Sequence, residues 1–234
     1  MIDVVHCCRI NCTSTVAKRV RFEFVRYGSS TQAMAALTRL CASFSPPARL
    51  VRRGMSRFVR GEVREARQDF DAAMAMDASL KPRLWQRGLA LYYLEEFEEG
   101  AKQFRDDVDA NPNDTEEAIW TYLCESRLVG TEEARRNFLH VGEDPRRVMR
   151  AAQGLFKTGK GIEVLREAGK REAQGHDDFY AKLYEGLFYE SEGDKSKAKE
   201  AILASLETNY AQRSGDYMAG LAQVHAKLRR WIDE

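Results

Sequence analysis

The feature that most limits the fold of this chain is the regular recurrence of glycine and phenylalanine in its middle part. The step from Gly54 to Gly88 equals the step from Phe70 to Phe104. The same step leads from Phe104 to Phe138. A fixed period of about 34 residues indicates a repeated supersecondary unit, and each copy is expected to pack mainly on its neighbours.

Each unit is predicted to be a pair of helices. In "LWQRGLALYYLEEFEEGAKQF", which begins at Leu84, apolar side chains recur at intervals of three and four positions. Turns that carry Gly, Asn, Asp or Pro separate such runs. The repeating part of the chain is therefore expected to be all-α.

Gly88 lies inside the first helix of its unit, where glycine costs about 0.5–1 kcal/mol relative to alanine. We therefore expect a second helix to cross there so closely that no side chain fits, with a large side chain opposite. The small residues at equivalent positions are Gly54, Gly88 and Gly186 on first helices, and Ala66, Gly100, Ala134 and Ala198 on second helices. Their large partners are predicted to be Phe70, Phe104, Phe138 and Ile202.

The stretch from Leu84 onwards resembles the tetratricopeptide repeat (TPR), with signature positions at Gly88, Gly100, Phe104 and Pro112. The resemblance implies a TPR-like α-α superhelix, which is a solenoid of helix-turn-helix repeats, closed here by a C-terminal capping helix. The third repeat departs from the motif by a tyrosine in place of the glycine, at Tyr122. Other departures replace a common leucine by charged residues, at Arg53, Arg87 and Glu185.

The repeats divide the chain into a leader, residues 1–47, and a helical repeat domain, residues 48–234. Repeats are expected near residues 47–80, 81–114, 115–145 and 179–212, with a degenerate segment at 146–178 and a capping helix at 213–232. The similarity extends more diffusely to TPR adaptor lipoproteins of the NlpI type, which dock other proteins. Their lipid-attachment signal is absent here, because Cys41 follows "LTRL".

Residues 1–48 differ in composition from the rest of the chain. They hold six basic and two acidic residues, a net charge of +4, and end near Pro46-Pro47, a pair expected to break a helix. Such a basic, Ser/Thr-rich stretch is typical of a transit peptide, with a plastid or mitochondrion as destination. The alternatives are a disordered extension or translation from Met34, and the location is then cytoplasmic.

Cysteine usage in the chain does not indicate a disulfide framework. Four of the five cysteines lie in the leader, which suits a reducing compartment. His6, Cys7, Cys8 and Cys12 can in principle supply four metal ligands, but no second cysteine pair at zinc spacing follows them. Neither a metal nor a cofactor is predicted.

No catalytic constellation stands out in the sequence, and the protein is not predicted to be an enzyme. The four histidines are dispersed, and none forms a His-Glu-x-x-His pattern. "KTGKG" at residues 157–161 lacks the spacing of a phosphate loop and is better interpreted as a turn between two helices. No apolar run approaches the length that a membrane span needs, so no transmembrane segment is predicted.

The TPR resemblance implies that the first helices line a concave groove that binds a protein or peptide. The function expected is therefore a non-catalytic scaffold or adaptor, with no small-molecule substrate. An aromatic helical stripe can equally form the core between repeats. The predicted partner-binding residues are Trp85, Gln86, Tyr92, Tyr93, Trp120, Leu123, Arg127 and Tyr184.

The alternative function is an organellar assembly or RNA-associated factor that uses a basic face. That face consists of Arg146, Arg147, Arg150, Lys157 and Lys160. Acidic residues such as Glu143 and Glu163 are interleaved with it, and the chain after residue 48 carries a net charge of −3. Nucleic acid is therefore not expected as the main partner. The sequence leaves the oligomeric state and the identity of the partner open.

Overall fold

The computed structural model describes residues 46–233 of the chain. The chain divides into two units, Met1–Arg49 and Leu50–Glu234, and nearly all the described residues belong to the second. The predictions for the leader, including the transit peptide and the cluster from His6 to Cys12, lie outside the described residues.

The described residues form helices and turns, without a strand. The α-helices are α3 (Pro46–Val59), α4 (Val63–Met76), α5 (Trp85–Tyr93), α6 (Phe97–Ala110), α7 (Thr115–Val129), α8 (Thr131–Arg136), α9 (Arg147–Thr158), α10 (Ile162–Gly169), α11 (His176–Ser191), α12 (Lys195–Leu206), α13 (Asn209–Arg213) and α14 (Tyr217–Leu228). Two 3-10 helices are η2 (Ala78–Arg83) and η3 (Lys170–Glu172). The prediction of an all-α fold is confirmed for this part of the chain.

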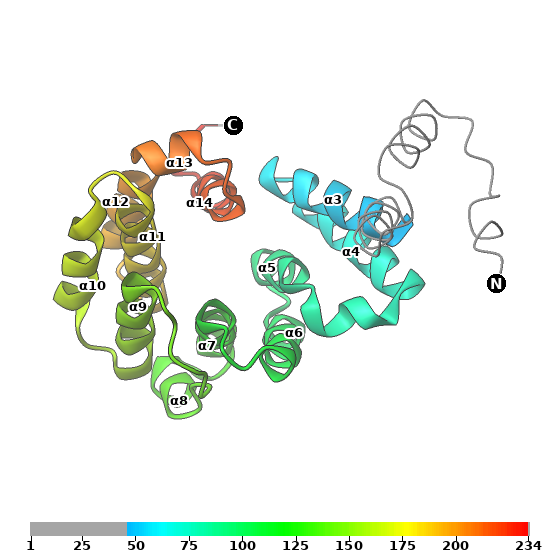
Figure 1. Ribbon diagram of the computed structural model, residues 1–234, viewed down its shortest axis with the longest axis horizontal. Coiled ribbons are helices and arrows are strands. Elements are labelled where there is room, and N and C mark those ends of the chain that lie inside the picture. Colours follow the sequence, from blue (N-terminus) through cyan, green and yellow to red (C-terminus); the bar gives the residue numbers. More distant parts are fainter. Residues whose placement is uncertain (1–45, 234) are drawn as a thin grey trace, which may run out of the picture. The chain divides into compact units, whose positions relative to one another are not determined.

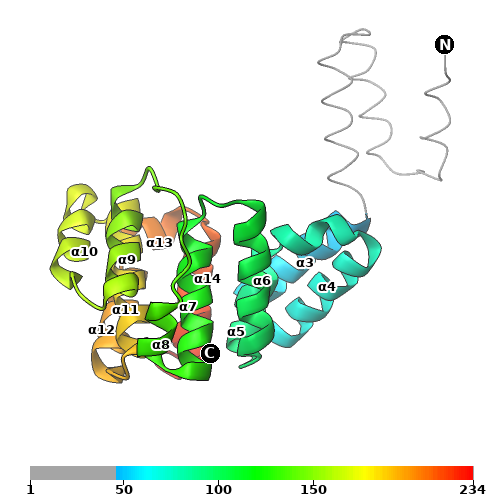
Figure 2. The ribbon, with the colours of Figure 1, turned by 90° about the horizontal axis from the view of Figure 1, so that it is seen from below.

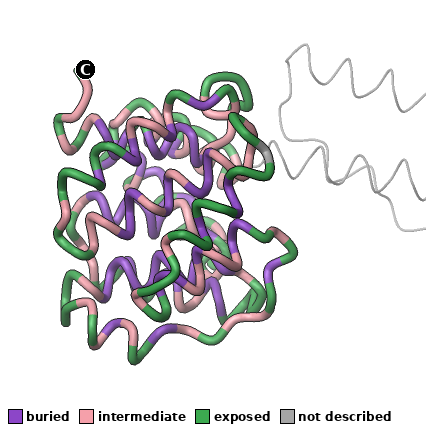
Figure 3. Tube along the Cα trace, turned by 90° about the vertical axis from the view of Figure 1, so that its left-hand side faces the viewer, coloured by how far each residue is buried: buried purple, intermediate pink, exposed green. Residues whose placement is uncertain are grey.

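Successive helices pack as pairs, and each pair packs on the next. From α5 onwards, Figure 1 shows the first helices α5, α7, α9 and α11 on the inner side of a curve, with α6, α8, α10 and α12 outside them. Figure 2 shows these helices standing side by side with their axes roughly aligned. In Figure 3, buried positions recur along one side of the helices, and the connecting turns are largely exposed.

The close helix crossings predicted at the three glycines are present. A Cβ atom added to Gly88 would lie 2.6 Å from the Phe104 ring, and one added to Gly54 would lie 2.6 Å from the Phe70 ring. At Gly186 the same distance separates the added atom from Cγ1 of Ile202. The glycines therefore let an aromatic or branched side chain of the second helix rest directly on the first helix.

The other predicted repeat positions also behave as packing residues. The small side chains on second helices are buried, as are the large partners (Ala66, Phe70, Gly100, Phe104, Ala134, Phe138, Ala198 and Ile202). Where Tyr122 replaces the glycine, its ring stays 6.1 Å from that of Phe138, centroid to centroid. Pro112 lies exposed in the turn between α6 and α7.

The three charged residues predicted to depart from a TPR pattern form ion pairs between helices. Arg53 of α3 donates to Asp69 of α4 over 2.6 and 2.8 Å. Arg87 of α5 is buried and pairs with Asp71 and Glu99, and Glu185 pairs with Arg166 of α10. Each charged residue thus makes a charge-assisted hydrogen bond to an adjacent helix.

Two boundaries differ from the sequence predictions. Helix α3 already begins at Pro46, two residues before the predicted start of the repeat domain, and the first turn of a helix does not need the missing N–H groups of Pro46 and Pro47. The segment predicted as a capping helix at 213–232 contains a turn at Gly215, whose φ of 69° favours glycine, and α14 begins only at Tyr217. The turn between α9 and α10, predicted from "KTGKG", is confirmed by positive φ values at Gly159 and Gly161.

Helix α14 does not only close the array by packing on α12. It also contacts helices near the beginning of the repeat domain, since Gly220 lies against Val59 of α3. Figure 1 shows α14 on the same side of the curve as the first helices. None of the helices between residues 46 and 233 is both long and apolar enough to cross a membrane.

Candidate interaction surface

The inner face is defined as the sides of α5, α7, α9 and α11 turned toward α14, and two of the residues predicted to bind a partner, Trp85 and Tyr93, contact α14 there. Five of the predicted partner-binding residues are buried, namely Tyr92, Tyr93, Trp120, Leu123 and Tyr184. Trp85 and Gln86 are half-buried, and Arg127 is exposed with its guanidinium carbon 5.0 Å from the Phe97 ring centroid. In this conformation, the predicted groove is therefore largely filled by side chains of the protein itself.

The filling comes in part from the first half of α14. The Tyr217 ring stacks on the Phe58 ring of α3, with the centroids 5.5 Å apart. It also makes an edge contact with the Trp85 ring of α5, with the centroids 5.4 Å apart. A Cβ atom added to Gly220 would lie 2.8 Å from Cγ2 of Val59, so only glycine permits this approach. Phe58, Val59 and Trp85 thus form a seat for α14. Aromatic pairs of this kind stabilise a contact by more than their buried apolar area alone would give.

The second half of α14 is held by a polar latch, consisting of Tyr93, Glu190, His225 and Arg229. The Tyr93 hydroxyl lies 3.0 Å from Nδ1 of His225, and Nε2 of His225 lies 2.9 Å from Glu190. Arg229 Nε donates to the same carboxylate over 2.5 Å. The latch therefore joins α5, α11 and α14 through one fully buried imidazole.

The arrangement favours one tautomer of His225. Burial acts to raise the pKa of Glu190, but its contact with His225 and the charge of Arg229 outweigh burial and lower that pKa to about 2. An ionised carboxylate can only accept, so its place 2.9 Å from Nε2 favours the neutral form with the proton on that nitrogen, and Tyr93 then donates to Nδ1. Burial lowers the pKa of His225, although Glu190 acts in the opposite direction. The histidine is thus held neutral at pH 7.

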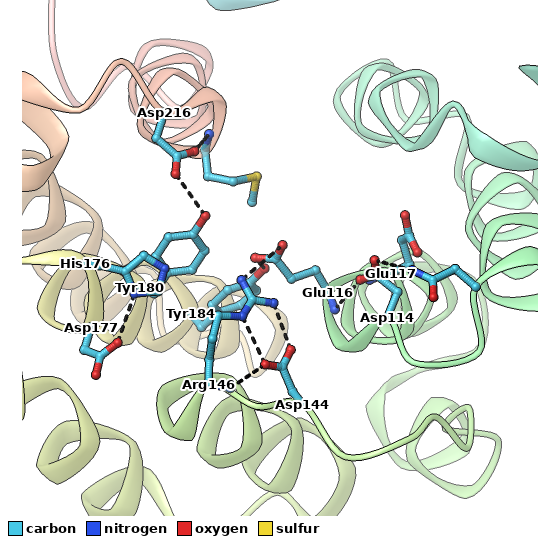
Figure 4. Close-up of polar contacts among 12 residues, drawn as sticks. Asp114, Glu116, Glu117, Asp144, Arg146, His176, Asp177, Tyr180, Tyr184 and Asp216 are labelled. Carbon is cyan, nitrogen blue, oxygen red and sulfur yellow. Dashed lines mark hydrogen bonds and ion pairs between the residues drawn. The ribbon is translucent and has the colours of Figure 1, made fainter. Parts of the chain in front are cut away.

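A second polar cluster, the polar mouth, lies where α7, α9, α11 and α14 begin (Figure 4). Tyr184 of α11 donates to Glu116 of α7 over 3.0 Å. Arg146, directly before α9, donates to Asp144 over 2.8 and 3.0 Å and lies 3.9 Å from Glu116. Asp216 caps α14 by accepting from the Met218 N–H over 2.7 Å. Four helices far apart in sequence thus supply one constellation.

Tyrosine hydroxyls complete the mouth. Tyr180 and Tyr210 both donate to Asp216, over 3.3 and 2.6 Å. The His176 ring stacks on the Tyr180 ring, with the two centroids 4.4 Å apart. The guanidinium carbon of Arg146 lies 5.9 Å from the Tyr180 ring centroid. The N-terminal turn of α14 is therefore tied to α11 and to α13 by one hydrogen bond each, through its capping aspartate.

The mouth carries more negative than positive charge. Glu116 and Asp144 pair with the guanidinium of Arg146, whereas Asp216 accepts hydrogen bonds from two tyrosine hydroxyls and a backbone N–H. Burial raises the pKa of Glu116 to about 7, although Arg146 and Tyr184 lower it. The Glu116 side chain still exposes 24% of its surface and Arg146 exposes 36%, so both remain reachable from solvent. These groups suit hydrogen bonds to peptide groups or to a cationic side chain.

Two buried carboxyl groups lie apart from the mouth. Asp107 of α6 and Glu117 of α7 each have one carboxyl oxygen without a hydrogen-bond partner. Burial raises the pKa of Asp107 to about 7. Burial and the nearby Asp114 and Asp107 raise that of Glu117 to about 9. Glu117 is therefore protonated at neutral pH and acts as a packing group rather than as a charge.

No group of three or more His, Cys, Asp or Glu side chains within residues 46–233 is placed to hold a metal ion. Cys124 is buried, and burial raises the pKa of its thiol, which keeps it from acting as a nucleophile.

The basic face of the alternative hypothesis is only partly free. Arg146 is engaged by Asp144 and Glu116, and Arg150 donates to the backbone oxygens of Asp144 and Pro145 over 2.6 and 3.0 Å. These arginines are thus used within the protein, which lowers the positive charge available to a phosphate backbone.

Sequence reasoning missed the residues that α14 contributes, namely Asp216, Tyr217, Gly220, His225 and Arg229. Gly220 and His225 lie in an amphipathic run, and the same helical periodicity that located the repeats covers them. Periodicity does not tell which helix such a face meets, so their partners could not be named. No protein-family model matches the chain, and no curated protein is significantly similar to it.

Proposed function

We propose that residues 50–234 act as a non-catalytic adaptor that binds a protein partner at the inner face. The observation that supports this is that the inner face already holds a helix, α14. It does so with aromatic rings, a close glycine contact and a buried histidine. These are the features by which grooves recognise amphipathic helices.

The polar mouth supports the same proposal. Its part-exposed Glu116 and Arg146 lie beside buried tyrosines, which combines an apolar floor with directional polar groups. Such a combination is suited to fixing the orientation of a peptide. The excess of carboxylates favours a partner segment that carries lysine or arginine near the mouth.

Site-specific photo-crosslinking tests the proposal. A benzophenone amino acid is placed at Arg127, a predicted groove residue, or at Arg146 of the polar mouth, and at Lys102 or Lys199 of the outer helices as matched controls. We expect one protein to be linked from both Arg127 and Arg146 and from neither outer position, with mass spectrometry identifying the linked peptide. Links from the outer helices alone would contradict the inner-face proposal and place the working surface on the convex side.

Salt dependence separates this function from the alternative in which the basic face binds RNA. Binding to phosphates weakens steeply as ionic strength rises, because counterions are released. A protein partner seated on aromatic rings is expected to show a much weaker dependence. Crosslinked RNA in place of protein, lost as salt is raised, would refute the adaptor proposal.

A further inference from the structure

Helix α14 differs from the other helices in the way it is held. The repeat helices interlock through glycine–aromatic contacts such as that of Gly88 with Phe104. Helix α14 instead joins the array through a turn at Gly215, where an added side chain would meet nothing within 4 Å. It crosses from α12 to α3 and α5, which are far from it in sequence.

The latch is unusual for a permanent core. It buries His225 and the carboxylate of Glu190 at an interface that is otherwise aromatic. Burying polar groups adds less stability than burying apolar residues of the same volume, because the neutral imidazole, the Glu190 carboxylate and its ion-pair partner Arg229 must all be desolvated. The same groups are readily hydrated when the helix leaves, so the latch suits an interface that opens and closes.

From these observations we propose that α14 is a built-in ligand of the inner face, and that the partner presents a helix of the same chemistry which replaces it. The inference rests on the proposed adaptor function and names the class of partner: an amphipathic helix. Its contact face would carry an aromatic ring where Tyr217 lies, a glycine at the place of Gly220, and a hydrogen-bonding side chain at the place of His225. Those positions share one side of a helix.

Each element of this pattern follows from a measured contact. The aromatic ring is required by Phe58 and Trp85, which meet Tyr217 at 5.5 and 5.4 Å. The glycine is required by Val59, which leaves no room for a Cβ atom at Gly220. The hydrogen-bonding side chain is required by the buried Tyr93 hydroxyl, which would lose its hydrogen-bond partner if His225 were not replaced by a similar group.

A binding experiment with the full chain tests the proposal. The probe is a fluorescein-labelled synthetic peptide of residues 214–232, followed by fluorescence anisotropy. In the wild-type chain α14 competes with the peptide, so weak binding is expected. In the Gly220→Leu chain the resident helix is expelled by overlap with Val59, and the peptide is expected to bind at least about ten-fold more tightly.

Two further arms keep the test decisive. The Tyr217→Ala chain weakens the resident helix without adding bulk, so it replaces Gly220→Leu if circular dichroism shows that the latter unfolds. A peptide that itself carries Gly220→Leu is expected to bind neither variant. Equal binding of the peptide to wild type and both variants, no binding to any, or binding of the altered peptide would each overturn the proposal.

The identity of the occupant is tested in the same samples. Size-exclusion chromatography is expected to give a monomer for the wild-type chain. A dimer that exchanges α14 between copies would make a second copy the occupant and would refute a separate partner helix. If the peptide test fails while inner-face crosslinks to a protein persist, the adaptor function stands and only the replacement of α14 is wrong.

Discussion

Helix α5 makes contacts of two different kinds. The first is repeated: Gly88 meets Phe104 of the adjacent helix α6, and equivalent contacts occur at Gly54 and Gly186. The second occurs once: Trp85 and Tyr93 meet α14, which lies near the far end of the chain. The first contact is apolar and repeated, whereas the second is partly polar and occurs once. Repetition builds the array, and the single contact determines what the inner face holds.

The largest effect on stability is expected at the repeated contact of glycine with a large side chain. Gly88→Leu places atoms where the Phe104 ring lies, so we expect the free energy of unfolding to fall by about 1–3 kcal/mol or more. The matched control is Gly154→Leu in α9, where an added Cβ meets nothing within 4 Å. There the better helix propensity is expected to leave stability unchanged or raise it by up to about 1 kcal/mol. Chemical denaturation measures both, and equal losses would contradict the close crossing.

The contrast explains how much of the molecule could be predicted. The glycine–phenylalanine contacts are local and periodic, so their spacing identified the helix pairs, the small and large partners, and the all-α fold. The turn at 157–161 was predicted for the same reason, since glycines mark it. The start of α3 at Pro46 was not predicted, because proline in a first turn and proline after a helix have the same sequence signature.

The candidate site was less accessible to sequence reasoning. The predicted partner-binding residues could be named from the repeat pattern, but two of them, Trp85 and Tyr93, pack against α14, which returns from the far end of the array. The polar mouth combines residues from Glu116 to Asp216, and no local pattern links them. Such contacts arise from the curvature of the whole array, which a periodic pattern does not specify.

The next largest effect on stability is expected at the single contact between α5 and α14, in the latch. His225→Gln disturbs a fully buried imidazole between Tyr93 and Glu190, and we expect a loss of about 1–3 kcal/mol at pH 7.5. The exposed His140 provides the control, and His140→Gln is expected to stay within about 0.5 kcal/mol of wild type. Similar losses in both variants would mean that the latch contributes nothing specific.

The latch also gives stability a defined pH dependence. The pKa of His225 is lowered in the folded state, so its contribution is present above its ordinary value of 6.5 and is lost as pH falls below that value. Glu190, with a pKa near 2 against an ordinary 4.5, adds a further loss between these two values. Thermal unfolding from pH 7.5 to 4 should show this decline in wild type and a smaller one in His225→Gln.

Asp107 of α6 and Glu117 of α7 are expected to make stability depend on pH in the direction opposite to that of the latch. The pKa values of Asp107 and Glu117 are raised to about 7 and about 9, so the folded state holds their protons longer than the unfolded chain does. Their contribution is present at acid pH and is lost as pH rises through 7 to 9. We therefore expect Glu117→Gln, which cannot ionise, to raise the free energy of unfolding by about 1–2 kcal/mol at pH 9. No gain over wild type at pH 9 would show that Glu117 is ionised without penalty.

The smallest effect concerns one hydroxyl of the latch. Tyr93→Phe keeps the ring against Phe58 and Trp120 but removes the donor to Nδ1 of His225, so we expect a loss of about 1 kcal/mol. The measured loss of unfolding free energy distinguishes a hydrogen bond from simple ring packing, because packing alone predicts no change in stability. A double-mutant cycle with His225→Gln isolates the pair, since contacting residues are expected to couple by about 0.5 kcal/mol or more. Strict additivity in that cycle would show that α14 is seated by its aromatic and glycine contacts alone, and the partner helix would then need no hydrogen-bonding group at that position.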